Sequence, residues 1–109
     1  MATGKVYILN TAILTGYGRW RFEGPLAVEG AREVLAAGFV SAIGHAGAAL
    51  FLTRLLGVNV PVNRVTVDLQ IGDRAVVLRL KERLPEGAVL NEEQMRNLPF
   101  ELGLLTREG

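Results

Sequence analysis

The chain of 109 residues contains one histidine, His45, where an apolar run gives way to a helical pattern. The stretch from Phe39 to Gly57 reads F-V-S-A-I-G-H-A-G-A-A-L-F-L-T-R-L-L-G, and its alanines and leucines recur at helical spacing. We therefore expect His45 in the first turn of a helix, near unpaired backbone N–H groups and the positive end of the helix dipole. A phosphate can bind there, and histidine is well suited to acid–base chemistry. A lone histidine at such a position can also be structural or simply solvated.

Short polar residues follow the first predicted strand. Lys5–Asn10 reads K-V-Y-I-L-N, a β-branched and aromatic run that predicts a central strand. The run ends in Asn10 and Thr11, residue types that either contact a ligand at a strand end or close a turn. Further on, Arg19–Phe22 alternates basic and aromatic side chains, as a short half-exposed strand would. Such an alternation would stack a base and hold a phosphate, or it would simply pack its aromatic rings inward.

A basic face is the next feature that could do chemistry. Residues 63–70 alternate between polar and apolar side chains, and residues 75–84 resume the alternation after a turn at 71–74. We therefore predict a β-hairpin in which Arg64 faces Lys81. One face of this hairpin would collect the basic side chains Arg64, Arg79, Lys81 and Arg83. Because facing like charges repel, this face would favour an anion; otherwise it would be an ordinary polar surface.

The remaining pattern completes one small α/β (α+β) domain over residues 1–109. The other expected elements are a helix from Gly24-Pro25 to Gly38, a connection over Val58–Val62, a helix over 91–96 and a strand over Phe100–Leu105. The element order β-β-α-β-α-β-β-α-β predicts a mixed sheet of about five strands flanked by helices.

Composition excludes several kinds of site. The chain has no cysteine, which excludes disulfides and thiolate ligands and would suit a reducing cytoplasm. It shows no signal-peptide pattern and no apolar run of roughly 20 residues, so we expect neither secretion nor a membrane helix. A single histidine argues against zinc, and the carboxylates Glu29, Glu33, Glu92 and Glu93 form no recognisable oxygen cage. We therefore expect chemistry without a metal or a cofactor. The net charge of +1 does not decide whether the ligand is an anion.

Familiar catalytic motifs are missing, which narrows the chemistry further. The sequence has no G-x-S-x-G, no second histidine for a hydrolase triad, and no Walker or Rossmann glycine pattern. A histidine, an arginine and a carboxylate without a metal suit cleavage of an RNA phosphodiester, because the substrate's own 2′-OH is the nucleophile. The protein then orients that hydroxyl, stabilises the phosphorane with arginine and protonates the leaving 5′-oxygen.

Six ordered blocks of sequence resemble one protein family over nearly the whole chain. They are V-Y-I-L-N-T-A-I-L-T at 6–15, G-P-L at 24–26, F-V-S-A-I-G-H at 39–45, L-L-G-V-N-V-P-V-N-R-V at 55–65, R-L-P-E-G at 83–87 and L-P-F-E-L-G-L-L at 98–105. Through these blocks the chain resembles the viral type III anti-CRISPR ring nucleases, a family that also has cellular and prophage members. The resemblance implies a small dimeric α/β protein that binds cyclic tetra-adenylate, the second messenger of type III CRISPR defence. It also implies metal-independent cleavage into linear di-adenylate with a 2′,3′-cyclic phosphate, which switches off that signal in the cytoplasm.

The resemblance assigns roles to individual residues. His45 would be the general acid for the leaving oxygen, Arg83 would stabilise the transition state, and Glu86 would organise water or a proton. The expected ligand contacts are Asn10, Thr11, Ile43, Gly44, Arg64 and, from the basic face, Arg79. The expected partners are cyclic tetra-adenylate and a second copy of the chain, because two sites related by a two-fold axis can each address one of two opposite phosphodiesters. No membrane and no long nucleic acid is expected.

Two other classes of function remain open. A binding protein would sequester cyclic tetra-adenylate without cutting it, although the joint presence of His45, Arg83 and Glu86 argues against this role. A ligand-free interaction protein would use the apolar helix as a partner surface, and the basic strand face argues against it. Product analysis and a thermal shift with the cyclic nucleotide would separate these alternatives.

Overall fold

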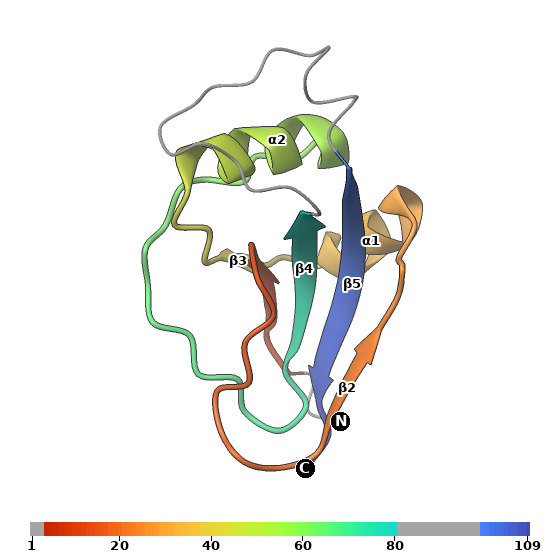
Figure 1. Cartoon of the computed structure of the whole chain (residues 1–109), viewed down its shortest axis with the longest axis vertical. Coiled ribbons are helices and arrows are strands. Elements are labelled where there is room, and N and C mark those ends of the chain that lie inside the picture. Colours follow the sequence, from red (N-terminus) through yellow and green to blue (C-terminus); the bar gives the residue numbers. More distant parts are fainter. Residues whose placement is uncertain (1–3, 81–98) are drawn as a thin grey trace.

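The computed structural model describes residues 4–80 and 99–109. Its elements are β1 (Val6–Leu9), β2 (Trp20–Glu23), α1 (Val28–Leu35), β3 (Val40–Ser41), α2 (Ala46–Leu56), β4 (Arg74–Leu80) and β5 (Phe100–Arg107). The strands form one sheet in the order β2-β5-β4-β1-β3 (Figure 1). β1 is parallel to both β3 and β4, whereas β5 is antiparallel to β4 and to β2. This arrangement confirms the predicted α+β fold with a mixed sheet of five strands.

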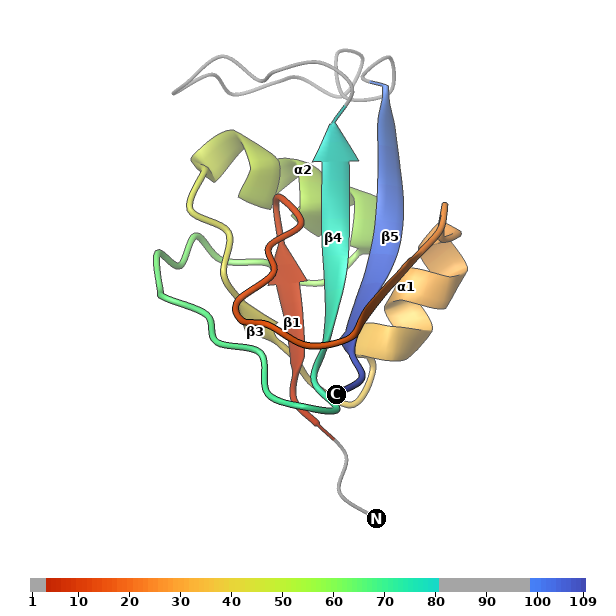
Figure 2. The same ribbon diagram turned by 60° about the horizontal axis from the view of Figure 1, so that its bottom comes forward.

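Both helices cover the same face of the sheet (Figure 2). The apolar side of each helix packs on side chains at every second position of the strands, which point to that face. The resulting core includes Ile8, Val76, Leu78 and Leu102 from the sheet, Ala31 and Leu35 from α1, and Phe51 and Leu52 from α2. Each of these side chains is almost completely removed from water, so the hydrophobic effect holds both helices on this face.

The opposite face of the sheet is covered by irregular chain instead of helices. A second apolar cluster of Leu9, Leu69, Ala75, Val77 and Leu105 lies there. Trp20 of β2 and Val67 of the chain between α2 and β4 pack against this cluster. Figure 2 shows the chain between β1 and β2 crossing in front of the strands. The domain is therefore a sheet with a helical layer on one face and a thinner cover on the other.

The central helix forms as its sequence predicts, with one change at its start. α2 ends at Gly57, whose φ of 70° is the left-handed conformation that favours glycine at a helix C-terminus. His45 has extended backbone angles and is the N-cap residue, one position before the predicted first turn. The first predicted helix also begins later than expected, at Val28, so Gly24-Pro25 belongs to the connection that precedes it.

The predicted hairpin is wrong, because residues 63–70 do not form a strand. Both edges of β4 are already occupied: Ala75 pairs with Tyr7 of β1 on one side and with Leu105 of β5 on the other. Residues 63–70 instead run across the sheet face and bury Leu69, with Val67 packed beside it. The alternating pattern of residues 63–70 therefore reflects burial of one side of an extended segment, and this segment does not pair as a strand.

Candidate functional site

Three parallel strands end at one edge of the sheet. β1 lies between β3 and β4, and all three point the same way, so the residues after them meet at their carboxyl edge (Figure 1). Asn10 follows β1, while Gly44 and His45 follow β3. β1 thus has a parallel neighbour on each side, and α/β sheets bind ligands at the carboxyl ends of their parallel strands. This edge is the candidate functional site.

His45 is held at this edge by the helix that it caps. Its Nδ1 accepts a hydrogen bond of 3.2 Å from the backbone N–H of Ala48. A nitrogen that accepts carries no proton, so the neutral ring carries its proton on Nε2. Nε2 is buried and has no hydrogen-bond partner among the described residues. The Nε2–H is therefore a polar group of the ring that the described residues leave unsatisfied.

The start of α2 also leaves positive potential at this edge. The first turn of the helix contains no acidic side chain. Backbone N–H groups of a helix start and the helix dipole attract anions when no carboxylate competes for them. A phosphate placed beside His45 would meet both the helix start and the free ring N–H.

Arg64 lies against Gly44, the residue before His45, because the chain after α2 is bound to the end of β3. The backbone N–H of Asn63 donates to the carbonyl of Ile43 at 2.8 Å, and Arg64 Nε donates to the carbonyl of Gly44 at 3.0 Å. A Cβ on Gly44 would lie 3.4 Å from Arg64 Cγ, so the arginine side chain lies close across this glycine. Arg64 is therefore bound to the residue directly before His45, whereas Arg83, the arginine predicted to stabilise the transition state, lies outside the described residues.

A network of small polar side chains holds this arrangement. The buried hydroxyl of Ser41 donates to the carbonyl of Pro61 at 2.6 Å, and Asn63 Nδ2 donates to the carbonyl of Ser41 at 2.7 Å. Thr53 of α2 exchanges two hydrogen bonds with the backbone of Val60. Sequence reasoning missed these residues. Their only local signal is a polar side chain within an otherwise apolar element.

Three further predicted contacts lie at the same edge. Asn10 is half-buried directly after β1, and Thr11 beside it is exposed. Ile43 is completely buried, so only its backbone could line a pocket. Its carbonyl is already bound to Asn63, which fits a supporting role for this residue.

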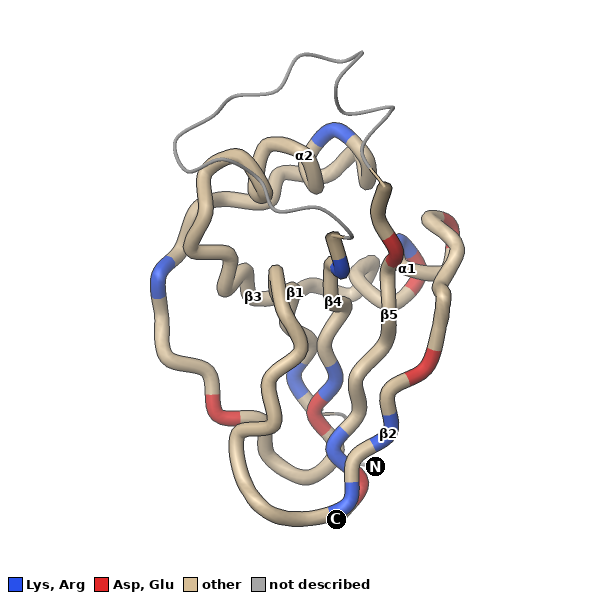
Figure 3. The backbone as a smooth tube through the Cα atoms, viewed as in Figure 1, with Lys and Arg blue, Asp and Glu red and all other residues tan. Residues whose placement is uncertain are grey.

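The predicted basic face is not formed as expected. Arg64 lies outside the sheet, and Arg79 of β4 forms an ion pair of 3.2 Å with Glu101 of β5. Figure 3 shows acidic residues among the basic ones along the described backbone. Three other residues of the prediction, together with the helix expected over 91–96, lie outside the described residues: Lys81, Arg83 and Glu86.

Two searches for other kinds of site gave negative results within residues 4–80 and 99–109. No group of three or more histidine, aspartate or glutamate side chains there is arranged to hold a metal ion. Over the same ranges, no helix combines the length and the apolar character that crossing a membrane requires.

Comparison with known proteins identifies the family. A sequence profile described as STIV B116-like matches residues 6–102, which is most of the chain. The chain belongs to the STIV B116-like family. The matched range contains the whole described edge, from Asn10 through His45 to Arg64.

Relatives of this B116-like chain occur in archaeal viruses and in a bacterium. Protein ORF117 of Acidianus two-tailed virus is 40% identical over 108 residues, which cover 94% of this chain and 92% of that protein. Protein 26 of Sulfolobus islandicus filamentous virus is 35% identical, over 91% of this chain and 88% of its own length. YddF of Bacillus subtilis is 28% identical, over 94% of this chain and 97% of its own.

A solved structure has the same fold. B116 of Sulfolobus turreted icosahedral virus superposes with a TM-score of 0.79 and covers 95% of this chain and all of its own. The two sequences are 22% identical, so the likeness establishes the fold alone. The names of these relatives state no activity and no ligand.

Proposed function

We propose that this B116-like protein is a metal-independent ring nuclease that binds cyclic tetra-adenylate and cuts it into linear di-adenylate with a 2′,3′-cyclic phosphate. In a cell with type III CRISPR defence it would act as an anti-CRISPR protein, because removal of the messenger silences the nucleases that depend on it. The observation that carries the proposal is the His45 ring at the strand edge: its buried Nε2 has no partner among the described residues, and Arg64 is bound to the carbonyl of the preceding Gly44.

The arrangement suits transesterification of an RNA-type phosphodiester. The 2′-oxygen of one ribose forms a bond to phosphorus while the bond from phosphorus to the 5′-oxygen of the next nucleotide breaks. The leaving 5′-oxygen takes a proton from Nε2 of a protonated His45, and the 2′-OH gives up its proton to a water molecule. Arg64 and the start of α2 offset the charge that builds on the phosphorane oxygens. The carboxylate and the second arginine of this proposal are Glu86 and Arg83.

A homodimer would match the symmetry of the ligand. Cyclic tetra-adenylate has four phosphodiesters, and a two-fold axis through its centre relates opposite ones. Each subunit would then present its His45 to one of two opposite bonds. Sedimentation at micromolar concentration, with and without the ring, measures this directly. A strictly monomeric protein that still cleaves the ring would contradict the dimeric site.

The decisive experiment is incubation with labelled cyclic tetra-adenylate in EDTA, with His45→Asn as the inactive control. Asparagine can cap a helix, so this variant removes the imidazole and keeps the helix start. We expect linear di-adenylate from the native protein and a loss of about 10²–10⁴-fold in the variant. Tight binding without product from either protein would support the sequestering role. No thermal shift with the ring would support a ligand-free interaction protein.

A further inference from the structure

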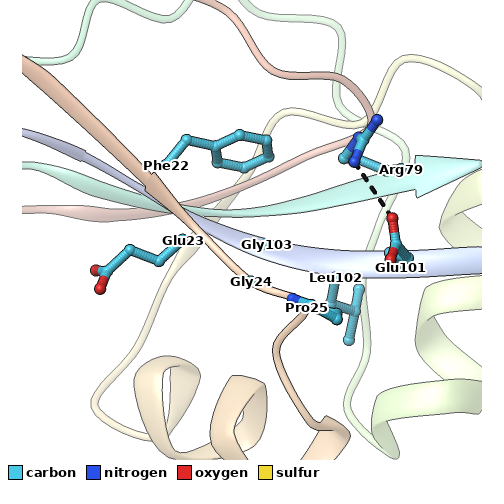
Figure 4. A pocket seen from close by; sticks show the side chains of 8 residues that line it. All are labelled: Phe22, Glu23, Gly24, Pro25, Arg79, Glu101, Leu102 and Gly103. Carbon is cyan, nitrogen blue, oxygen red and sulfur yellow. Dashed lines mark hydrogen bonds and ion pairs between the residues drawn. The ribbon is translucent and has the colours of Figure 1, made fainter.

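The sheet face without helices is covered over only part of its length. Near the carboxyl end of β4 lies a hollow of about 170 Å³ (Figure 4). Phe22 forms one wall and the Arg79–Glu101 ion pair forms another, with Gly103 between them. Phe22 remains 45% exposed. The residues that line the hollow include none of Gly44, His45 and Arg64.

Gly103 lets the Phe22 ring lie against the middle of β5. A Cβ at position 103 would lie 2.5 Å from Phe22 Cε1 and 2.8 Å from Cζ, so any larger residue would push the ring away. The ring is thus held against the strand at one edge while part of it stays open to solvent. In Figure 4 the ring and the Arg79 guanidinium lie on the same side of β4 and β5, with the hollow between them.

The chemistry of the walls suits a flat heterocycle that carries an amino group. Aromatic side chains on an open sheet face stack nucleobases, so Phe22 would lie against the face of the base and the Arg79–Glu101 pair would meet its edge. The Glu101 carboxylate accepts from an exocyclic amine, and Arg79 donates to a ring nitrogen. Adenine presents these two groups next to each other. The volume is below the roughly 300–1,000 Å³ of pockets for drug-sized ligands, so it would hold one base and not a whole oligonucleotide.

We propose that this hollow is a binding site for the adenine base of a nucleotide, distinct from the candidate active site. The inference does not depend on ring cleavage, because it follows from Phe22, Gly103 and the Arg79–Glu101 pair alone. Its ligand would be a free or single-stranded adenine nucleotide with its sugar and phosphate directed toward solvent.

The test is a titration with adenosine 5′-monophosphate, followed by amide shifts in ¹H–¹⁵N NMR spectra. We expect the amides of Gly24 and Gly103 to shift with a Kd in the millimolar range, since one base supplies most of the contact. Phe22→Leu keeps apolar volume beside Gly103 and removes the aromatic face, so its Kd should rise about tenfold or more. Tyr17→Leu is the matched control, because Tyr17 is a fully exposed aromatic outside the hollow. Its Kd should equal that of the native protein.

Two comparisons make the result decisive. Purine riboside 5′-monophosphate lacks the amino group, so it should bind the native protein more weakly than the adenine nucleotide does. The two nucleotides should bind equally to Glu101→Met, which keeps the length of the side chain and removes the carboxylate acceptor. Arg64→Ala should leave the shifts of Gly103 unchanged, which separates this hollow from the candidate active site. The proposal is overturned if Gly103 does not shift up to the solubility limit of the nucleotide. It is also overturned if Phe22→Leu binds as the native protein does, or if both nucleotides bind the native protein alike.

Discussion

At the scale of single residues, His45 caps α2 and is the proposed general acid, and these two roles require different protonation of Nδ1. Nδ1 accepts the hydrogen bond from Ala48 that caps α2, and this requires Nδ1 without a proton. A general acid must carry protons on both ring nitrogens, and the cap bond is lost in that form. The proposed catalytic cycle would therefore open and close one hydrogen bond at the start of α2. Substitutions can separate the two roles.

We expect His45→Asn and His45→Ala to differ in stability but not in activity. Asparagine restores a cap, so the free energy of unfolding should stay within about 0.5 kcal/mol of the native value, whereas alanine should lose about 1 kcal/mol. Both variants lack the imidazole and should lose cleavage to the same extent. Urea unfolding and product analysis measure the two effects separately. Equal stability of the variants would show that the cap bond contributes nothing.

A modified substrate serves as the control for the acid role. If the leaving 5′-oxygen is replaced by sulfur, departure no longer needs a proton, because a thiolate is a much better leaving group. The 5′-thio ring should therefore be cut by His45→Asn nearly as fast as by the native protein. Persistent loss of cleavage with this substrate would assign His45 to binding and not to proton transfer.

At the scale of elements, the connection after α2 positions Arg64. Asn63 binds the end of β3 through both its backbone and its side chain, directly before the arginine. Asn63→Ala removes the side-chain bond, worth about 0.5–1.5 kcal/mol, and should weaken binding of cyclic tetra-adenylate about fivefold. In an Arg64→Ala background the same substitution should have almost no further effect, because the two residues act together. Affinity measurements on the four proteins complete this double-mutant cycle.

The matched control for this cycle is Asn59→Ala, which changes an exposed asparagine in the same connection. It should leave affinity unchanged. Fully additive effects of Asn63→Ala and Arg64→Ala would mean that Asn63 contributes only to general stability.

At the scale of the whole molecule, Arg107 binds the thin cover to the sheet. Its guanidinium donates to the carbonyl of Leu69 at 2.6 Å and to that of Tyr17 at 3.0 Å, and its Cζ lies 5.3 Å from the Trp20 ring centroid. One side chain at the end of β5 thus binds both segments that run over this face. Because neither α1 nor α2 covers this face, the packing of the described residues on it depends strongly on these contacts.

Arg107→Lys should lower the free energy of unfolding by about 2 kcal/mol, because lysine cannot serve two diverging carbonyls and stack on the indole together. Urea unfolding measures the loss. Arg21→Lys is the control: Arg21 makes only exposed ion pairs, with Glu23 and Glu108, and the change should stay within about 0.5 kcal/mol. An equal loss in both variants would show that Arg107 is no more important than a surface arginine.

The local sequence pattern was sufficient to predict much of the secondary structure of this protein. The apolar stripes predicted both described helices, and Gly57 predicted the end of α2. The β-branched and aromatic run Lys5–Asn10 predicted β1, and the apolar run Phe100–Leu105 predicted β5. These features depend on neighbours within a few residues, so sequence spacing describes them directly. The place of His45 at a helix start was predictable for the same reason, within one residue.

Only the tertiary structure decided which segments meet across the sheet. Residues 63–70 have the periodicity of a strand, yet β1 and β5 occupy both edges of β4, so the segment packs on the sheet face instead. Arg79 pairs with Glu101 and Asn63 binds Ser41 only because strand order brings distant residues together. Periodicity reports which side of a segment is buried, but the choice of partner depends on competition among all strands for the same edges.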